Sequence, residues 1–397
     1  MKSAQSLILS YNKSYPEPRQ IEKYRAMQES LLRFYRGTCH LFYDRLDTIG
    51  APKDKTRTWI CGDLHLENFG SFKGDNRLVY FDINDFDEAV LAPVSWDVLR
   101  FITAILVSGD FLKYTDKEAS SIARSALRNY TAAIIRGKAL IEQRETATGL
   151  MKQFFDQTAN RRREDFIDRV TIKKGKRRSL KIDNIRTRKL KPELHKRLMD
   201  WLPGCLASLD KMNDLAVRDC AFRIAGIGSL GLDRYVILAK QKSTGKNFLL
   251  DMKEAKVSSL LQHLHVKQPE WKNQADRIIT TQSRMQFCPP ALLSSEHFDK
   301  KYFVLKELQP IQDKMDFNLC GGIVSDMEHV ILSMADISAY AHLRSTGRHG
   351  SSTADDLAGL VSRSGWQKDM YNLSQELSIQ MGKDYKAFLE YKIPGRA

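Results

Sequence analysis

The stretch from residue 61 to residue 88 constrains the fold of this chain most strongly. It joins a loop rich in Gly, Asp, His and Asn (61–70) to an apolar run that turns acidic (78–88). Between them, residues 73–76 read Lys-Gly-Asp-Asn, which is typical of a tight turn. The sequence therefore predicts a loop, a β-hairpin and an acidic strand end, in that order.

These polar residues are of the types that phosphoryl transfer requires. An Asp, an Asn five residues later and carboxylates beyond a short hairpin form the metal and base set of kinase-type chemistry. Asp63 is the candidate base, and Asn68 together with Asp82 or Asp85 could hold Mg²⁺. Asp87 could hold a second ion.

A second segment supplies a candidate phosphate-binding turn. Residues 222–238 read as strand, Gly-rich turn and strand, and Lys253 follows near the end of the next strand. The turn lacks the Gly-Lys-Ser/Thr ending of a P-loop and does not open a helix, which excludes the common nucleotide fingerprints. The candidate nucleotide-binding residues are Gly226, Gly228, Ser229, Gly231 and Lys253.

Most of the remaining chain has the apolar spacing of helices. Helices are expected over 20–46, 97–109, 116–146, 148–160, 192–201, 206–215, 273–286, 323–344, 354–364 and 367–391. Strands are expected over 56–60, 247–255 and 301–308. The chain thus appears as two mainly α regions that flank a small β-rich region.

Residues 161–197 form a basic segment. They contain 16 Lys or Arg against five Asp or Glu, a net charge of +11 in a chain whose total is +15. Such a density suits an anionic partner, which could be nucleic acid, a lipid surface or a polyphosphorylated molecule. A solvated, partly mobile insertion explains it equally well. Phe166 is its single aromatic residue, which argues against a platform for stacked bases.

Cysteine usage and hydropathy bear on the compartment. The six cysteines are scattered with no CxxC pair, which is typical of reduced thiols. The apolar run at the start is short for a signal peptide, and the longest apolar stretch, 98–107, contains Arg100 and is short for a bilayer. We therefore expect a cytoplasmic protein with no transmembrane segment.

Two family resemblances rest on these motifs. Residues 61–68, Cys-Gly-Asp-Leu-His-Leu-Glu-Asn, resemble the loop His-Gly-Asp-x-His-x-x-Asn of the aminoglycoside- and choline-phosphotransferase branch of the protein-kinase-like superfamily, except at Cys61. Over nearly its full length, the chain more closely resembles the bacterial family known as domain of unknown function 2252. The segments that carry this resemblance are 34–37, 62–70, 81–89, 226–231, 253–255 and 341–342.

The resemblance also bears on the metal ligand. Asn84-Asp85-Phe86-Asp87 is similar to the Ile-Asp-Phe-Asp ending of the phosphotransferase branch, which slightly favours Asp85. Asp82 stays a co-candidate, because it lies 14 residues after Asn68, close to the usual hairpin length in kinases. The acid that orients Lys253 stays open among Glu254, Glu270 and the neutral Gln282.

The order of the motifs differs from that of ordinary kinases. There the Gly-rich loop precedes the catalytic loop, whereas here it follows by more than 150 residues. The resemblance therefore implies an α+β, bilobal, protein-kinase-like fold that is circularly permuted. Residues 1–215 would form the catalytic hairpin and helical lobe (with the basic segment), 216–310 a small β-rich nucleotide-binding lobe, and 311–397 helices that rejoin the first lobe.

The expected function is an ATP- and Mg²⁺-dependent phosphotransferase acting on a hydroxyl acceptor. The acceptor could be a small alcohol, a sugar, a phosphorylated metabolite or a protein side chain, and nucleotidyl transfer would use the same groups. The alternative is a catalytically silent nucleotide-binding or scaffold protein whose basic segment binds an anionic partner. If the bilobal site forms, Lys253 should lie within about 10 Å of Asp63 or of Asp82 and Asp85, directly or after closure of the lobes.

Overall fold

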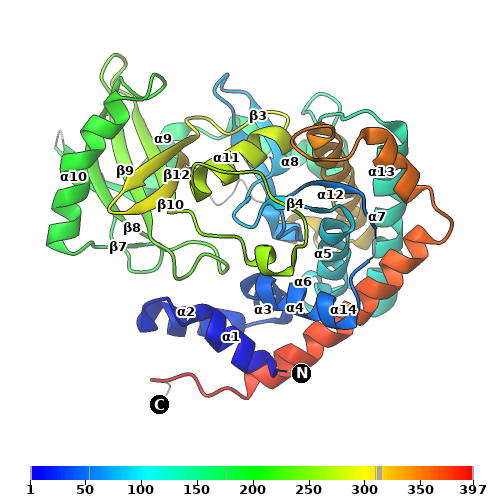
Figure 1. Cartoon of the computed structure of the whole chain (residues 1–397). Coiled ribbons are helices and arrows are strands. Elements are labelled where there is room, and N and C mark those ends of the chain that lie inside the picture. Colours follow the sequence, from blue (N-terminus) through cyan, green and yellow to red (C-terminus); the bar gives the residue numbers. More distant parts are fainter. Residues whose placement is uncertain (1, 53, 176, 309, 311–314, 396–397) are drawn as a thin grey trace.

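The computed structural model describes residues 2–52, 54–175, 177–308, 310 and 315–395. Figure 1 shows an α+β chain in which an antiparallel sheet lies beside a larger group of helices. We call these the sheet part and the helical part. In the described residues, no helix combines the length and the apolar character that crossing a bilayer requires.

The helical part combines both ends of the chain. Its helices are α1 (Ala4–Asn12), α2 (Glu17–Met27), α3 (Leu31–Gly37), α4 (Cys39–Ile49), α5 (Ser95–Leu106), α6 (Gly109–Leu112), α7 (Asp116–Arg136), α8 (Gly149–Asn160), α12 (Val324–Ser345), α13 (Ala354–Val361) and α14 (Trp366–Leu389). Short 3₁₀ turns are η1 (Leu66–Asn68), η2 (Ser259–His263) and η4 (Phe317–Cys320). Helix α14 packs against α1, α3, α4, α5 and α7, so the last helix joins the first ones (Figure 1).

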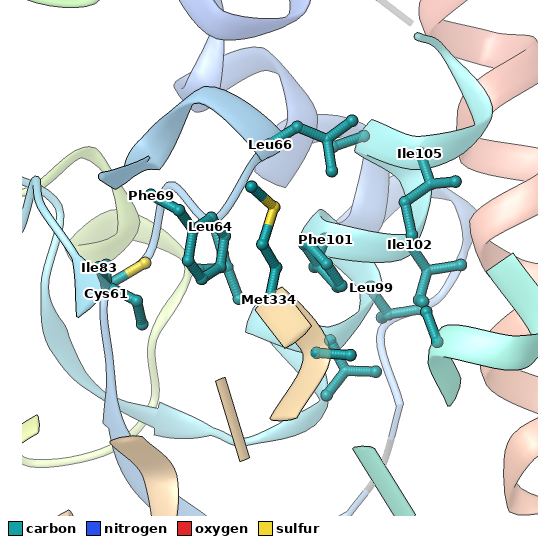
Figure 2. Close-up of a cluster of buried hydrophobic side chains, with 14 of the residues drawn as sticks. Cys61, Leu64, Leu66, Phe69, Ile83, Leu99, Phe101, Ile102, Ile105 and Met334 are labelled. Atoms are coloured by element: carbon teal, nitrogen blue, oxygen red, sulfur yellow. The ribbon is translucent and has the colours of Figure 1, made fainter. Parts of the chain in front are cut away.

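Two β-ribbons lie within the helical part. Strands β1 (Arg57–Ile60) and β4 (Val90–Pro93) form one, and β2 (Phe69–Lys73) and β3 (Val79–Ile83) form the other. The hairpin predicted for residues 61–88 is therefore confirmed. Its inner side chains join the main core, where Leu64, Phe69 and Ile83 lie close to Leu99, Phe101 and Met334 from α5 and α12 (Figure 2).

The sheet part is a six-stranded antiparallel sheet in the order β11-β12-β10-β9-β8-β7. Its strands are β7 (Thr187–Arg188), β8 (Leu215–Arg223), β9 (Arg234–Gln241), β10 (Asn247–Glu254), β11 (Ser294–Phe298) and β12 (Lys301–Glu307). Helix α11 (Gln274–Met285) packs against β11, β12 and α12, and so bridges the two parts.

Successive side chains of β9 point to opposite faces of the sheet, and both faces are covered. Tyr235, Ile237 and Ala239 pack with α10 (Pro192–Ala207), whereas Val236 and Leu238 pack against residues 163–180 of the basic segment. The basic segment contains α9 (Arg163–Val170) and the hairpin β5 (Thr171–Lys174)–β6 (Arg177–Leu180). Ile167 and Leu180 are its buried anchors. Residues 163–180, which were expected in the helical lobe, thus cover one face of the sheet, and α10 covers the other.

Three helix predictions were wrong in detail. The helix expected over 116–146 ends at Arg136, because Gly137 adopts a left-handed conformation with a φ of +67°. Residues 20–46 form parts of three helices rather than one, because Ser30 and Thr38 lie at breaks between them. The helix expected at 206–215 is absent: residues 208–214 form turns, and Leu215 starts β8. The amides of Leu209, Met212 and Leu215 each donate to the carbonyl three residues back, so the three-residue apolar spacing marks successive turns.

Candidate functional site

A cavity of about 390 Å³ lies where the helical part meets the sheet. This volume is in the range of small-molecule sites. The residues singled out from the sequence that line it are Asp63, Asn68, Asp85, Asp87, Gly226, Gly228, Ser229, Lys253 and Gln282. Segments that are more than 150 residues apart in the chain therefore face one space.

Helix α5 fixes the backbone of the loop at 61–68 through hydrogen bonds. Asp97, in the first turn of α5, accepts hydrogen bonds from the amides of Cys61 at 2.8 Å and Gly62 at 2.9 Å. Gly62 has a φ of +78°, and a Cβ at this position would collide with the carbonyl oxygen of Glu88. Only glycine fits such a conformation and such a close approach without strain. The loop is thus fixed by its backbone before any side chain acts.

Asp63 is paired with a buried cation. Arg100 of α5 is fully buried, and its Nη2 and Nε donate to Oδ1 of Asp63 at 2.7 and 3.1 Å. The guanidinium also lies over the ring of Tyr35 at 3.7 Å. These bonds use only one carboxylate oxygen, and the Asp63 side chain is 21% exposed. The arrangement orients Asp63 and leaves Oδ2 able to accept a proton or a hydrogen bond.

Asn68 joins this loop to the acidic turn after β3. Its Nδ2 donates to the carbonyl oxygens of Asp63 and Asp85, each at 3.1 Å, and its Oδ1 accepts the amide of Asp85 at 2.7 Å. Asn68 is buried, so these bonds fix the position of the turn. The second lone pair of Oδ1 is free to serve as a ligand.

Lys253 of β10 reaches across to the acidic turn. Its Nζ lies 2.9 Å from Oδ2 of Asp85 and 2.5 Å from Oδ2 of Asp87. Burial alone would lower the pKa of Lys253, but these carboxylates outweigh it and raise that pKa. The three acid-partner candidates, Glu254, Glu270 and Gln282, do not make this contact. Glu254 instead accepts from the amide of Asp233 and pairs with Lys301.

The two carboxylates that share Lys253 have opposite pKa shifts. Partial desolvation in the cavity would raise the pKa of Asp85, but the ammonium of Lys253 holds it below the usual range. Burial raises the pKa of Asp87, and the negative charge of Asp85 adds to that rise. Asp85 is 53% exposed and ionised, which makes it the more accessible ligand of the two.

Asp82 and Gly231 lie outside the cavity. Asp82 is buried on β3, and its Oδ2 accepts the amide of Phe287 at 3.1 Å and pairs with Arg344 at 3.2 Å. Gly231 packs against the ring of Tyr15. These contacts connect elements of the fold, so the geometry favours Asp85 over Asp82 as the cavity ligand.

A buried ionic cluster on the sheet side of the cavity was not found from the sequence. Asp251 binds Arg234 through both oxygens, at 2.8 and 2.5 Å, and binds Arg223 at 2.8 Å. Arg234 also donates to the carbonyl of Ala225 at 3.2 Å and thereby holds the Gly-rich loop. Strand periodicity could have pointed to Asp251, because Asp251 and Lys253 are two residues apart on one strand and their side chains therefore share a face.

The donor set bears on which metal could bind. Among the described residues, no three or more His, Cys, Asp or Glu side chains are grouped as a metal site. Asp85 and Asp87 form a carboxylate pair beside Asn68. Mg²⁺ is usually held by one or two carboxylates together with phosphate oxygens and waters. Of the described residues, Asp85 and Asp87 could hold a magnesium ion only together with a phosphate ligand.

The fold and the site define an α+β protein in which charged side chains line a cavity between a sheet and a helical part. The chain belongs to the family described as an uncharacterized protein conserved in bacteria (DUF2252), whose model matches residues 17–391. No curated protein and no solved structure matches the chain.

Proposed function

We propose that this chain is an ATP- and Mg²⁺-dependent phosphotransferase with a kinase-like, circularly permuted site. The observation that carries the proposal is the contact of Lys253 with Asp85, 168 residues apart, in a cavity that Asp63 and the Gly-rich loop also line. Phosphoryl transfer uses groups of these kinds: a cation, a pair of carboxylates, a base and a backbone turn that approaches the phosphates.

The sheet side would hold the nucleotide. The backbone of Gly226, Gly228 and Ser229 would approach the phosphates, and Lys253 would contribute its charge to them. Asp85 and Asp87 would share a metal ion with the phosphates, with Asn68 fixing their turn. When bound, Mg²⁺ would neutralise part of the charge on the β- and γ-phosphates.

The loop side would act on the acceptor. Oδ2 of Asp63 would orient an acceptor hydroxyl and accept its proton, while Arg100 keeps Oδ1 fixed. This division supports transfer by positioning and charge, with little covalent chemistry from the protein. Nucleotidyl transfer would use the same groups with ATP in another orientation.

Turnover of γ-labelled ATP against a bacterial metabolite pool tests this proposal. Asp63→Asn keeps the side-chain shape, so it should still bind Mg²⁺–ATP but transfer label about 10²- to 10⁴-fold more slowly. Asp82→Asn is the matched control, because Asp82 lies outside the cavity and should affect stability alone. Equal transfer by wild type and Asp63→Asn would reject Asp63 as the base. Binding of Mg²⁺–ATP with no transfer to any acceptor would favour the silent nucleotide-binding protein.

The basic segment would bind an anionic partner in either case. Its exposed cations include Lys173, Lys174, Arg177, Lys181 and Lys189. Titration with duplex DNA, single-stranded RNA, phosphatidylserine vesicles and polyphosphate at two salt concentrations would identify the class. Binding to none of these four at low salt would remove the partner role.

A further inference from the structure

Lys23 is a buried cation that lines the cavity. It lies on α2 and is 1% exposed. In the described part of the chain, its ammonium makes no hydrogen bond or ion pair, and it lies over the rings of Tyr11 and Tyr15, 5.6 Å from each centroid. A fully buried lysine is rare without a partner, because desolvation of its charge is costly. The ring faces offset only part of that cost.

One oxygen of each nearby carboxylate is engaged by another group. Oε2 of Glu88 accepts from the hydroxyl of Ser258 at 2.9 Å and from the amide of Ser259 at 2.6 Å. Oδ1 of Asp63 is held by Arg100. Burial lowers the pKa of Lys23 to about 8, although the charge of Glu88 opposes the fall. The amine therefore lies close to losing its charge, which a bound anion would prevent.

The negative charges of Glu88 and Asp63 both oppose the fall in the pKa of Lys23, so its ammonium lies near the loop that carries Asp63. Lys23 comes from the N-terminal helices, as does His40, whereas Lys253 and the Gly-rich loop come from the sheet part. The ring of His40 stacks on Tyr11 at 3.8 Å, and its buried Nε2 has no hydrogen-bond partner among the described residues. Two polar groups without hydrogen-bond partners among the described residues thus line the same cavity as Asp63.

We propose that Lys23 is the counter-ion for an anionic oxygen group, a carboxylate or a phosphate, on the acceptor that Asp63 acts upon. The acceptor class is therefore a small hydroxy acid or a phosphorylated alcohol. The anion site rests on the geometry of Lys23 alone, whereas its assignment to an acceptor rests on the proposed function.

Site-resolved acetylation of lysines tests the anion site without an activity assay. The wild-type protein is treated with acetic anhydride at pH 8, with and without inorganic phosphate, and each amine is quantified by mass spectrometry. Phosphate should protect Lys23 and leave Lys256 unaffected. Lys256 is the matched control, because its Nζ also lies over the ring of Tyr15, at 4.0 Å, but it does not line the cavity. Equal labelling of Lys23 with and without phosphate would overturn the proposal.

Two variants extend the test. Lys23→Met should bind phosphate about 10- to 100-fold more weakly than wild type, as expected for a lost charge-assisted contact, and Lys256→Met should bind it as wild type does. Lys23→Met should also melt at the same or a higher temperature, because an unpaired buried charge is replaced by an apolar chain of similar size. Unchanged phosphate affinity, or a large fall in melting temperature, would show that Lys23 has a structural role.

Mg²⁺–ATP separates the two proposals. Protection of Lys23 by Mg²⁺–ATP alone would assign Lys23 to the nucleotide and overturn the acceptor site. Failure of wild type to bind Mg²⁺–ATP, with protection of Lys23 by phosphate retained, would remove the phosphotransferase and keep the anion site.

Discussion

The ion pair between Asp63 and Arg100 connects the candidate base to the stability of the fold. In the described residues, Asp63 is the one carboxylate that forms an ion pair with this fully buried guanidinium. The remaining partners of Arg100 are the carbonyl of Tyr35 at 2.9 Å and the rings of Tyr35 and Phe42. Removing one partner of a buried pair costs about 3–5 kcal/mol. Because Asp63 is 21% exposed and water can reach the gap, we expect about 3 kcal/mol for Asp63→Ala.

A double-mutant cycle measures this coupling. Arg100→Met leaves a carboxylate that water can hydrate, so we expect a cost of about 2 kcal/mol. The double variant removes both charges and should also lose about 2 kcal/mol rather than the additive 5, a coupling of about 3 kcal/mol. Urea unfolding at pH 7, followed by tryptophan fluorescence, gives the four free energies of unfolding.

Additive losses would refute this reasoning. If the double variant loses the sum of the two single losses to within about 0.5 kcal/mol, the two side chains are not coupled. Asp63 would then be oriented by its backbone alone. The cycle also decides how Asp63→Ala is used, because a variant that loses activity through unfolding says nothing about a base.

Two further predictions concern the loop and a buried acid. Gly62→Ala should destabilise the protein by more than about 2 kcal/mol, because of its φ of +78° and the contact with Glu88. Gly204→Ala, in open space on α10, should stabilise it by about 0.5–1 kcal/mol, and equal denaturation midpoints would contradict both. Burial raises the pKa of Asp336 to about 6, so the stability linked to this group is present below pH 4 and is lost as the pH rises through 6. Asp336→Asn should therefore stabilise by about 2 kcal/mol at pH 8 and by nearly nothing at pH 4, and equal gains in thermal unfolding at both pH values would contradict this.

The hairpins of this fold were predictable because their signals are local. The Lys-Gly-Asp-Asn turn and the alternation of β2 and β3 lie within about fifteen residues, and the Gly-rich turn lies between two apolar runs. Periodicity failed where different structures share a spacing. The apolar residues at 206, 209, 212 and 215 suit a helix, but they mark turns that lead into β8.

The choice between Asp82 and Asp85 could not be made from local sequence. Asp82 lies within β3, opposite Gly70. Its carboxylate is bound by Arg344, which is 262 residues away in the chain. Asp85 lies beyond the strand end, where Asn68 fixes its backbone and Lys253 reaches its carboxylate. Spacing to Asn68 does not encode either tertiary contact.

The same limit explains which site residues the sequence missed. Motifs identified candidate site residues such as Asp63, whereas the counter-ions come from other elements. Arg100 of α5 pairs with Asp63. Arg223 and Arg234 pair with Asp251. Counter-ions can be inferred once the fold is known, because a buried charge needs one. Lys23 is buried and lines the same cavity, but no described residue forms an ion pair with it. The rule that assigns Arg100 to Asp63 therefore predicts that the partner of Lys23 is a ligand.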